Sequence, residues 1–273
     1  MIDELPAIDD HCHLGEMTDG HAGIRRFLSD DLIAQMDRNG INKTIVCHLI
    51  LPLREREDFA QGNNLIMEAV QKYPDRLAGL CVINPKHGQY AQQEARRCLA
   101  SGMKGIKLHP ILHGFYSISG ELVNPIMEIA EEAHVPIVTH SDFHVTCCTP
   151  YEVARLAARF PRVTVVMLHM GIDPAGLAHI PDIVAPVSNL VVDTSLTADL
   201  PHGVYVNSVR KLGADRVLFG SDGPIVSIEA NLAKLAAAEQ AYGLTREEKR
   251  KILGANAARV FGIDDVPSGR EHS

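Results

Sequence analysis

The stretch IDDHCHLG, Ile8–Gly15, places two histidines one residue apart directly after a short apolar run. Successive side chains of an extended strand point to opposite faces, so we expect His11 and His13 on the same face of a strand. Two neutral imidazoles on one face are a way to begin a metal site. A pair of surface histidines would show the same spacing, so the stretch alone leaves both interpretations open.

The rest of the chain alternates short apolar runs with longer amphipathic stretches. Runs that are aliphatic on both faces, typical of buried parallel strands, predict eight strands at residues 7–11, 43–49, 77–83, 105–109, 136–140, 163–169, 189–194 and 216–222. Helical patterns follow at residues 29–39, 57–73, 89–101, 121–133, 150–160, 174–186, 204–212, 227–241 and 245–260. This alternation predicts an α/β fold, a single (β/α)8 TIM barrel with an extra C-terminal helix.

Three of the predicted helices carry recognisable start signals. Ser29 is a candidate N-cap of the first helix. Thr149 followed by Pro150 has the N-cap and first-turn residues of the fifth. Thr245 with Glu248 three residues later forms a capping-box pattern at the start of the last helix.

Composition limits the class of protein. Of the 273 residues, 46% are hydrophobic and 22% charged, which is ordinary for a globular protein with a sizeable core. The net charge of −8 argues against a nucleic-acid partner, and no apolar run approaches the ~18 residues that a membrane span needs. No signal-peptide pattern is present, so we expect a cytoplasmic protein that binds a small molecule, with a homodimer left open.

Domain organisation follows from the same pattern. No linker rich in Pro, Gly or Ser interrupts it, so residues 1–264 are predicted as one barrel domain and residues 265–273 as a polar tail. The six cysteines lack any C-x-x-C pair and do not indicate a disulfide framework. Cys47 and Cys81 lie inside apolar runs and are interpreted as small buried hydrophobic residues.

Residues able to bind metal gather at the C-terminal ends of five of the predicted strands, where barrel enzymes keep their active sites. They are His11, His13, Lys107, His109, His140, His169 and Asp222. Three imidazoles and one carboxylate, from His11, His13, His140 and Asp222, suit a zinc-like ion and leave one position for water. Asp222 could then accept a proton from that water, and His169 could act as a second base or bind a second metal.

Five motifs in this order resemble the amidohydrolase superfamily. They are DxHxH at 9–13, KLHP at 107–110, THS at 139–141, LHMG at 168–171 and GSDGP at 220–224. Within it, the chain is similar to the amidohydrolase-related branch that contains aminocarboxymuconate-semialdehyde decarboxylase, and ILGANAARVFGI at 252–263 resembles the final helix of that branch. The resemblance implies that His11, His13, His140 and Asp222 bind a divalent metal, with Zn²⁺ expected and one or two ions per chain. It also implies that His169 activates water or completes a second site.

Several positions keep alternative roles. Lys107 could bridge two metals if carboxylated, hold a substrate carboxylate, or neutralise Asp222. His109 shares the face of Lys107 and could contact substrate or only hydrogen-bond the loop above it. Arg54, after the second strand, could clamp a substrate carboxylate or belong to a solvated charge cluster. Asp193 could contact the site or cap the following helix.

The favoured activity is that of a metal-dependent hydrolase, in which metal-activated water attacks an amide, lactone or ester of a small polar substrate. The alternative is a metal-dependent, non-oxidative decarboxylase of a small carboxylic acid. Only 5% of the residues are aromatic and none is tryptophan, which speaks against a flat ring-binding slot and favours hydrolysis. The loops name no particular substrate.

Overall fold

Parallel strands form the inner ring of the molecule. The computed structural model describes residues 5–18, 24–49, 55–173, 176–197 and 203–264. The strands follow one another as β1 (Ile8–Thr18), β3 (Lys43–His48), β4 (Leu77–Gly79), β5 (Cys81–Val82), β6 (Ile106–Leu108), β7 (Ile137–Thr139), β8 (Val165–Met167), β9 (Leu190–Asp193) and β10 (Val217–Leu218). β4 and β5 make up one barrel strand, because the Leu80 N–H bonds the Val46 carbonyl and the Cys81 N–H bonds the Gly105 carbonyl, at 2.8 and 3.1 Å.

The first and last strands close the barrel. The backbone N–H of Asp10 donates to the carbonyl of Phe219 at 2.9 Å, and that of Asp222 donates to His11 at 2.8 Å. The His13 N–H donates in turn to the carbonyl of Gly223 at 2.7 Å. The chain therefore folds as the predicted TIM barrel, with β1 and the segment after β10 side by side.

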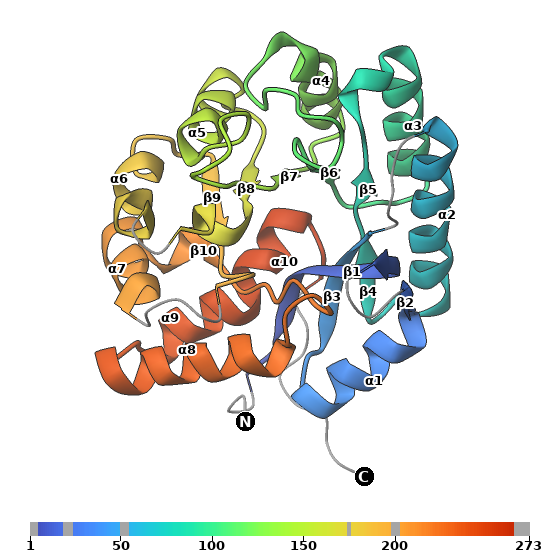
Figure 1. Cartoon of the computed structure of the whole chain (residues 1–273). Helices are drawn as coiled ribbons and strands as arrows, with labels where there is room; N and C mark the ends of the chain where they lie inside the picture. The colour runs from blue at the N-terminus through green and yellow to red at the C-terminus, as the bar shows by residue number, and fades with distance from the viewer. Residues whose placement is uncertain (1–4, 19–23, 50–54, 174–175, 198–202, 265–273) are drawn as a thin grey trace.

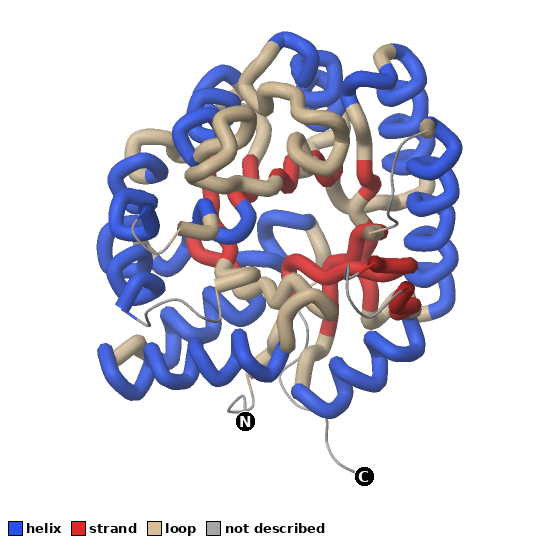
Figure 2. Tube along the Cα trace, viewed as in Figure 1, coloured by secondary structure: helices blue, strands red, loops and turns tan. Residues whose placement is uncertain are grey.

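Helices surround the strands as an outer layer (Figure 1, Figure 2). They are α1 (Ser29–Asn39), α2 (Arg56–Lys72), α3 (Gln89–Ala100), α4 (Asn124–Glu132), α5 (Pro150–Arg159), α6 (Ile180–Val184), α7 (Gly203–Leu212) and α8 (Ile228–Tyr242). In the described part of the chain, no helix is both long and apolar enough to cross a membrane. In place of one long helix at 174–186, the described residues 176–186 form a 3₁₀ turn at 176–179 followed by α6.

Helix starts largely follow the sequence signals. Thr149 and Thr245 cap α5 and α9 (Arg246–Arg250) through hydrogen bonds from backbone N–H groups to their side chains. Ser29 is instead the first helical residue of α1, and Leu28 occupies the N-cap position. The Leu28 N–H donates to the Asp31 carboxylate at 2.9 Å, which is the contact that the third helical residue makes in a capping box.

One strand was not expected. β2 (Ile24–Phe27) pairs antiparallel with the end of β1, from Gly15 opposite Phe27 to Thr18 opposite Ile24. This hairpin carries β1 well past the predicted end at residue 11, so both His11 and His13 lie within a strand.

Apolar side chains fill the barrel at its N-terminal end. The inward-facing set includes Ile8, Ile45, Leu80, Val138, Val166, Val191 and Leu218, and it continues into Ala257, Ala258 and Phe261 of α10 (Asn256–Phe261). The predicted C-terminal helix is thus present as α9, a π-helical turn at 251–255 and α10. Gly254 allows its close approach, because a Cβ there would lie 2.7 Å from the Pro6 carbonyl oxygen. Apolar residues therefore close the N-terminal end of the barrel, and the polar side chains described below lie at its C-terminal end.

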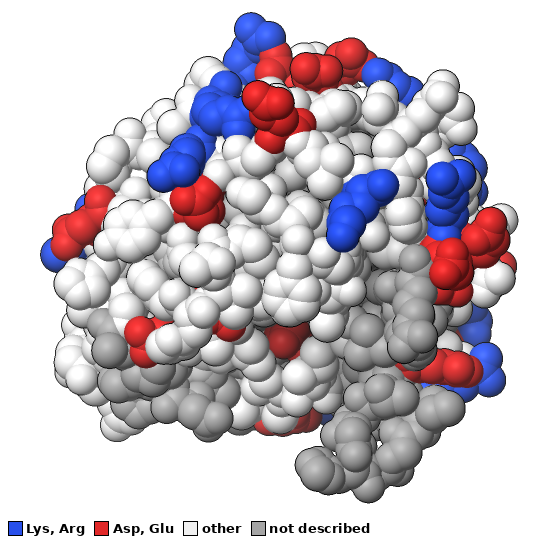
Figure 3. Space-filling model, turned by 45° about the horizontal axis from the view of Figure 1, so that its top comes forward, with Lys and Arg blue, Asp and Glu red and all other residues white. Residues whose placement is uncertain are grey.

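Charged residues are unevenly spread over the surface. In the view of Figure 3, most Lys, Arg, Asp and Glu side chains lie toward the edges, and few lie in the largely white central area. The predicted domain limit at residue 264 stays a prediction, since the tail at 265–273 lies outside the described residues.

Candidate metal centre

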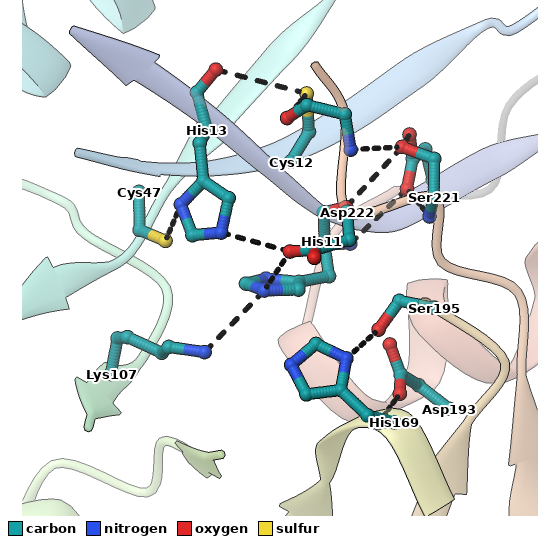
Figure 4. A network of polar contacts seen from close by, with 12 residues as sticks. His11, Cys12, His13, Cys47, Lys107, His169, Asp193, Ser195, Ser221 and Asp222 are labelled. Carbon is teal, nitrogen blue, oxygen red and sulfur yellow. Dashed lines mark hydrogen bonds and ion pairs between the residues drawn. The ribbon is translucent and has the colours of Figure 1, made fainter. Parts of the chain in front are cut away.

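Two histidines of β1 converge on one carboxylate. The Nε2 atoms of His11 and His13 lie 3.2 and 3.0 Å from Oδ1 of Asp222, and all three residues are at most 4% exposed. Figure 4 shows His11, His13 and Asp222 pointing toward one another at the junction of the first and last strands. The structure therefore brings together three of the residues expected to bind metal.

A bulge in β1 sets this arrangement. The register between β1 and β3 shifts between Asp9 and Cys12, so the strand is not the regular extended segment that the spacing argument assumed. The Asp9 carboxylate accepts hydrogen bonds from Ser221 N at 2.8 Å, Ser221 Oγ at 2.5 Å and His11 N at 3.2 Å. Burial raises the Asp9 pKa to about 6, against the effect of these bonds. Asp9 thus ties the bulge to the residue before Asp222.

Asp222 and His169 have backbone conformations that non-glycine residues seldom adopt. Their φ angles are +61° and +66°, in the left-handed region. The hydrogen bond from the Asp222 N–H to the His11 carbonyl holds the backbone of Asp222 in this conformation. Such conformations cluster at functional sites, where neighbouring contacts impose them.

His169 is fixed by two residues at the end of β9. Its Nδ1 forms a 2.8 Å hydrogen bond with Ser195 Oγ, and its backbone N–H donates to Asp193 Oδ1 at 2.6 Å. Since Nδ1 is engaged, Nε2 is the nitrogen left for the site. One ligand atom from each of His169, His11 and Asp222 lies within 4.8 Å of the others. Asp193 thus contacts the site and does not cap the next described α-helix, α7, which begins at residue 203.

His140 and His109 form a stacked pair beside this cluster. Their ring centroids are 4.3 Å apart with an interplanar angle of 13°, and the His140 ring lies 4.9 Å from that of His169. Burial, with Lys107 nearby, lowers the His140 pKa to about 3, so its imidazole is neutral as a metal ligand must be. His140 is in neither of the two close ligand groups that the described residues form, and its role as a ligand stays a prediction.

His109 also meets the loop that follows β6. Its Nδ1 accepts a 3.4 Å hydrogen bond from the Leu112 N–H. The hydrogen bond between His109 and the loop, one of the two alternatives considered from sequence, is therefore present. The stacking of His109 on His140 adds a contact with the site. A role in substrate binding stays a prediction.

Lys107 brings a buried cation into the cluster. Its Nζ lies 3.4 Å from Nε2 of His11, and the residue is 2% exposed. Burial lowers the Lys107 pKa, although Cys47, Asp222, Asp193 and Asp10 act in the opposite direction. Arg54, the other predicted substrate-binding residue, lies outside the described residues.

Two further carboxylates lie beneath these residues. Asp10 and Asp193 are fully buried, and both oxygens of Asp10 and Oδ2 of Asp193 have no hydrogen-bond partner among the described residues. A Cβ at Gly220 would lie 2.5 Å from an oxygen of each, so only glycine admits this approach. Burial raises the pKa of both groups, most strongly for Asp10, where Asp193 and Asp9 add to the effect.

Cys47 corrects one sequence interpretation. It is buried as expected, but its Sγ lies 3.3 Å from Nδ1 of His13, so it is part of the polar cluster and not only a small apolar residue. Burial opposes ionisation, yet His13 and His11 hold the Cys47 pKa well below its ordinary value. The apolar run around residue 47 hid this contact, whereas Ser195 was signalled only by its place at the end of a predicted strand.

The donor set fits a divalent metal. Ligand atoms around a tetrahedral ion with bonds of ~2.0–2.1 Å are about 3.3 Å apart, close to the 3.2 and 3.0 Å that separate the two imidazole nitrogens from Asp222 Oδ1. Asp222 is ionised, because His11, His13 and His169 overcome the effect of burial and hold its pKa well below the ordinary value. The buried Nδ1 of His11 has no partner among the described residues. Imidazole nitrogens and an ionised carboxylate are the donors that such ions take.

Comparisons with known proteins identify the family of the chain. The amidohydrolase family model matches residues 8–263. None of the curated proteins compared with the chain matches it.

Solved structures share the fold over nearly the whole chain. A 2,6-dihydroxybenzoate decarboxylase from Rhizobium is 18% identical with a TM-score of 0.75, covering 94% of this chain and 99% of its own. A 5-carboxyvanillate decarboxylase from Novosphingobium aromaticivorans, complexed with manganese and a nitrobenzoic acid, is 19% identical with a TM-score of 0.76, covering 96% and 97%. A probable 2-pyrone-4,6-dicarboxylic acid hydrolase from Acinetobacter baumannii is 17% identical with a TM-score of 0.71, covering 95% and 100%. At these identities the structural likeness shows the fold, while the match over residues 8–263 shows that the chain belongs to the amidohydrolase family.

Proposed function

We propose that this protein is a metal-dependent enzyme that removes CO₂ from a small planar carboxylic acid without oxidation. The order of the two activities considered from sequence is thereby reversed. Two of the three solved structures described above are decarboxylases of aromatic acids, and one is a probable hydrolase. Hydrolysis remains the second candidate, because an ionised Asp222 beside two imidazoles would suit water activation as well.

The observation that carries the proposal is the position of Lys107. A buried ammonium group costs free energy unless an anion accompanies it. Its Nζ is 3.4 Å from His11 Nε2, within the residues that would hold the metal. A substrate carboxylate would place a further anion beside Lys107, whereas a neutral amide or ester would not.

The absence of tryptophan carries less weight than it did from sequence. His109 and His140 already provide two flat rings stacked in parallel at 4.3 Å, and imidazoles are not counted among the aromatic 5%. A planar acid could continue such a stack.

Each residue of the site has its own role in the proposed reaction. A divalent metal held by His11, His13 and Asp222, with His140 or His169, would supply positive charge that fixes and polarises the substrate. Lys107 would bind the carboxylate. When the bond between the carboxylate and its carbon breaks, CO₂ leaves and the electron pair remains on that carbon. The carbon takes a proton that originates in solvent, and Asp222 and His169 are the candidates to relay it.

Isotope labelling separates the two activities. The metal-loaded protein would be screened with dihydroxybenzoates, 5-carboxyvanillate and 2-pyrone-4,6-dicarboxylate. In D₂O a decarboxylase releases CO₂ and leaves one deuterium on the carbon that lost it, and in ¹⁸O-water its organic product gains no label. A hydrolase product carries ¹⁸O instead. The His144→Asn variant, whose side chain is 75% exposed, should behave as the native protein, whereas Asp222→Asn should be impaired. Incorporation of ¹⁸O without CO₂ release would overturn the proposal.

A further inference from the structure

The side chain of Cys47 contacts the nitrogen of His13 that faces away from the candidate metal centre. The Nε2 atom of His13 lies 3.0 Å from Asp222 Oδ1, whereas its Nδ1 atom lies 3.3 Å from the Cys47 Sγ. Figure 4 shows these two contacts at opposite nitrogens of the ring. His13 is 4% exposed and Cys47 1% exposed. The buried ring of His13 is therefore held at both of its nitrogens.

The pairing of two neighbouring strands creates the contact with Cys47. In the parallel pairing of β1 and β3, His13 and Cys47 lie directly across from each other. Just beyond them, the Leu49 N–H donates to the carbonyl of Leu14 at 2.9 Å. The position of the sulfur beside His13 is therefore set by the backbone of the barrel.

A metal ion at Nε2 would decide which nitrogen of His13 carries the ring hydrogen. A neutral imidazole has a single N–H, so a ring that binds metal through Nε2 carries its hydrogen on Nδ1. Metal-binding histidines almost always donate this second N–H to a partner, which fixes the orientation of the ring. In this site, the Cys47 sulfur lies within reach of the Nδ1 hydrogen.

We propose that Cys47 is a positioning residue, whose sulfur accepts a hydrogen bond from the Nδ1–H of His13 and keeps Nε2 directed at the metal. The sulfur itself does not bind the metal. The inference rests on the metal centre of the proposed function but not on the reaction catalysed there.

Two other candidate ligands show what such a partner provides. The Nδ1 atom of His169 is held in the same way, by Ser195 Oγ at 2.8 Å. The Nδ1 atom of His11 has no partner among the described residues. Removing the Cys47 sulfur would leave the buried Nδ1 of His13 without its contact, and the ring would be free to turn its Nε2 away from Asp222.

The main test detects the ring hydrogen of His13 in full-length protein loaded with Zn²⁺. Nuclear magnetic resonance of ¹⁵N-labelled histidine rings shows which nitrogen carries the hydrogen, and through-bond correlations assign the signal to His13. In the native protein we expect a slowly exchanging hydrogen on Nδ1. In Cys47→Ala its signal should shift or disappear by exchange with water. Cys47→Ser should restore it in part, because a hydroxyl can accept the same bond.

Cys81 provides a matched control. It is equally buried on a barrel strand, β5, but its Sγ donates to the Gly105 carbonyl at 3.5 Å. Cys81→Ala removes a thiol and leaves a small cavity, as Cys47→Ala does, so both variants carry the same general cost to packing. The His13 signal should be unchanged in Cys81→Ala.

Two further measurements need no activity assay. In competition with a chelator, Cys47→Ala should bind Zn²⁺ about 10- to 100-fold more weakly than the native protein, and Cys81→Ala should bind it equally well. X-ray absorption of the native zinc-loaded protein should show nitrogen and oxygen neighbours at ~2.0–2.2 Å and no sulfur at ~2.3 Å. Together with the native resonance spectrum, this decides the question even if Cys47→Ala fails to fold.

The outcomes separate this inference from the proposed function. If Zn²⁺ binds but the His13 hydrogen lies on Nε2, or its signal is the same in Cys47→Ala, Cys47 does not position His13, although the protein still binds metal. A sulfur neighbour of the metal also overturns the inference, because Cys47 would then be a ligand. If the native protein binds no Zn²⁺, the metal centre and the inference both fail. If the His13 signal and the affinity behave as expected but only hydrolysis is found, the inference holds and the proposed decarboxylation fails.

Discussion

Replacing Lys107 with methionine tests the observation on which the proposed decarboxylation depends most. The change keeps the length of the side chain and removes the buried ammonium group. A hydrogen bond to a charged group contributes about 1.5–3 kcal/mol. If Lys107 binds the substrate carboxylate before and during bond cleavage, its loss should raise KM by about 10- to 150-fold and change kcat much less.

Steady-state kinetics and metal analysis on the same samples check this expectation. Lys104→Met is the matched control, since Lys104 lies just before β6 at the opposite end of the strand from the site. Metal content should be unchanged in both variants. A fall from two metals to one in Lys107→Met, with KM unaltered, would refute the carboxylate-binding role and identify a carboxylated, bridging lysine.

Three more predictions concern proton transfer, positioning and acid stability. Asp222→Asn should lower kcat by about 10²- to 10⁴-fold, and near-native turnover with full metal content would remove Asp222 from proton transfer. Ser195→Ala frees His169 Nδ1 and should cost about 10- to 100-fold in activity or metal affinity, measured by titration, while unchanged values would make the 2.8 Å contact incidental. Burial lowers the pKa of His48 and His113 to about 3 in the folded protein. Between about pH 3 and 6.5 these two histidines therefore bind two more protons in the unfolded chain, and they should contribute a rise in stability with pH of about 2.7 kcal/mol per unit. Urea unfolding at several pH values should show this slope reduced when both are changed to Gln, and an equal slope would contradict it.

The barrel and the place of its site could be predicted from sequence because both depend on strands. Apolar runs mark the strands, and a parallel barrel brings their C-terminal ends together, so residues as distant as His11 and Asp222 were expected to meet. The local backbone was not predictable. Neither the bulge in β1 nor the positive φ angles of His169 and Asp222 leave a periodic signal, because they depend on hydrogen bonds between distant strands.

The residues that contact the candidate ligands left a weaker signal in the sequence than the candidate ligands themselves. Cys47 was interpreted as apolar because a thiol in an apolar run has the pattern of any buried residue, and only the register with β1 sets it opposite His13. Ser195 escaped notice because a serine after a strand is common. Counting aromatic residues also missed the flat surfaces that His109 and His140 provide.

The candidate metal centre lies where the first strand meets the segment after the last, and this position connects stability with function. His11 and Asp222 are joined through backbone atoms, by Asp222 N to the His11 carbonyl, and through side chains, by Nε2 to Oδ1. Asp9 joins the same two segments, because its carboxylate accepts hydrogen bonds from the backbone N–H groups of Ser221 and His11. The hydrogen bonds that close the barrel are therefore the same ones that orient the ligands. A metal bound here would join the first strand of the chain to the segment after the last, stabilising the closed barrel on which its own site depends.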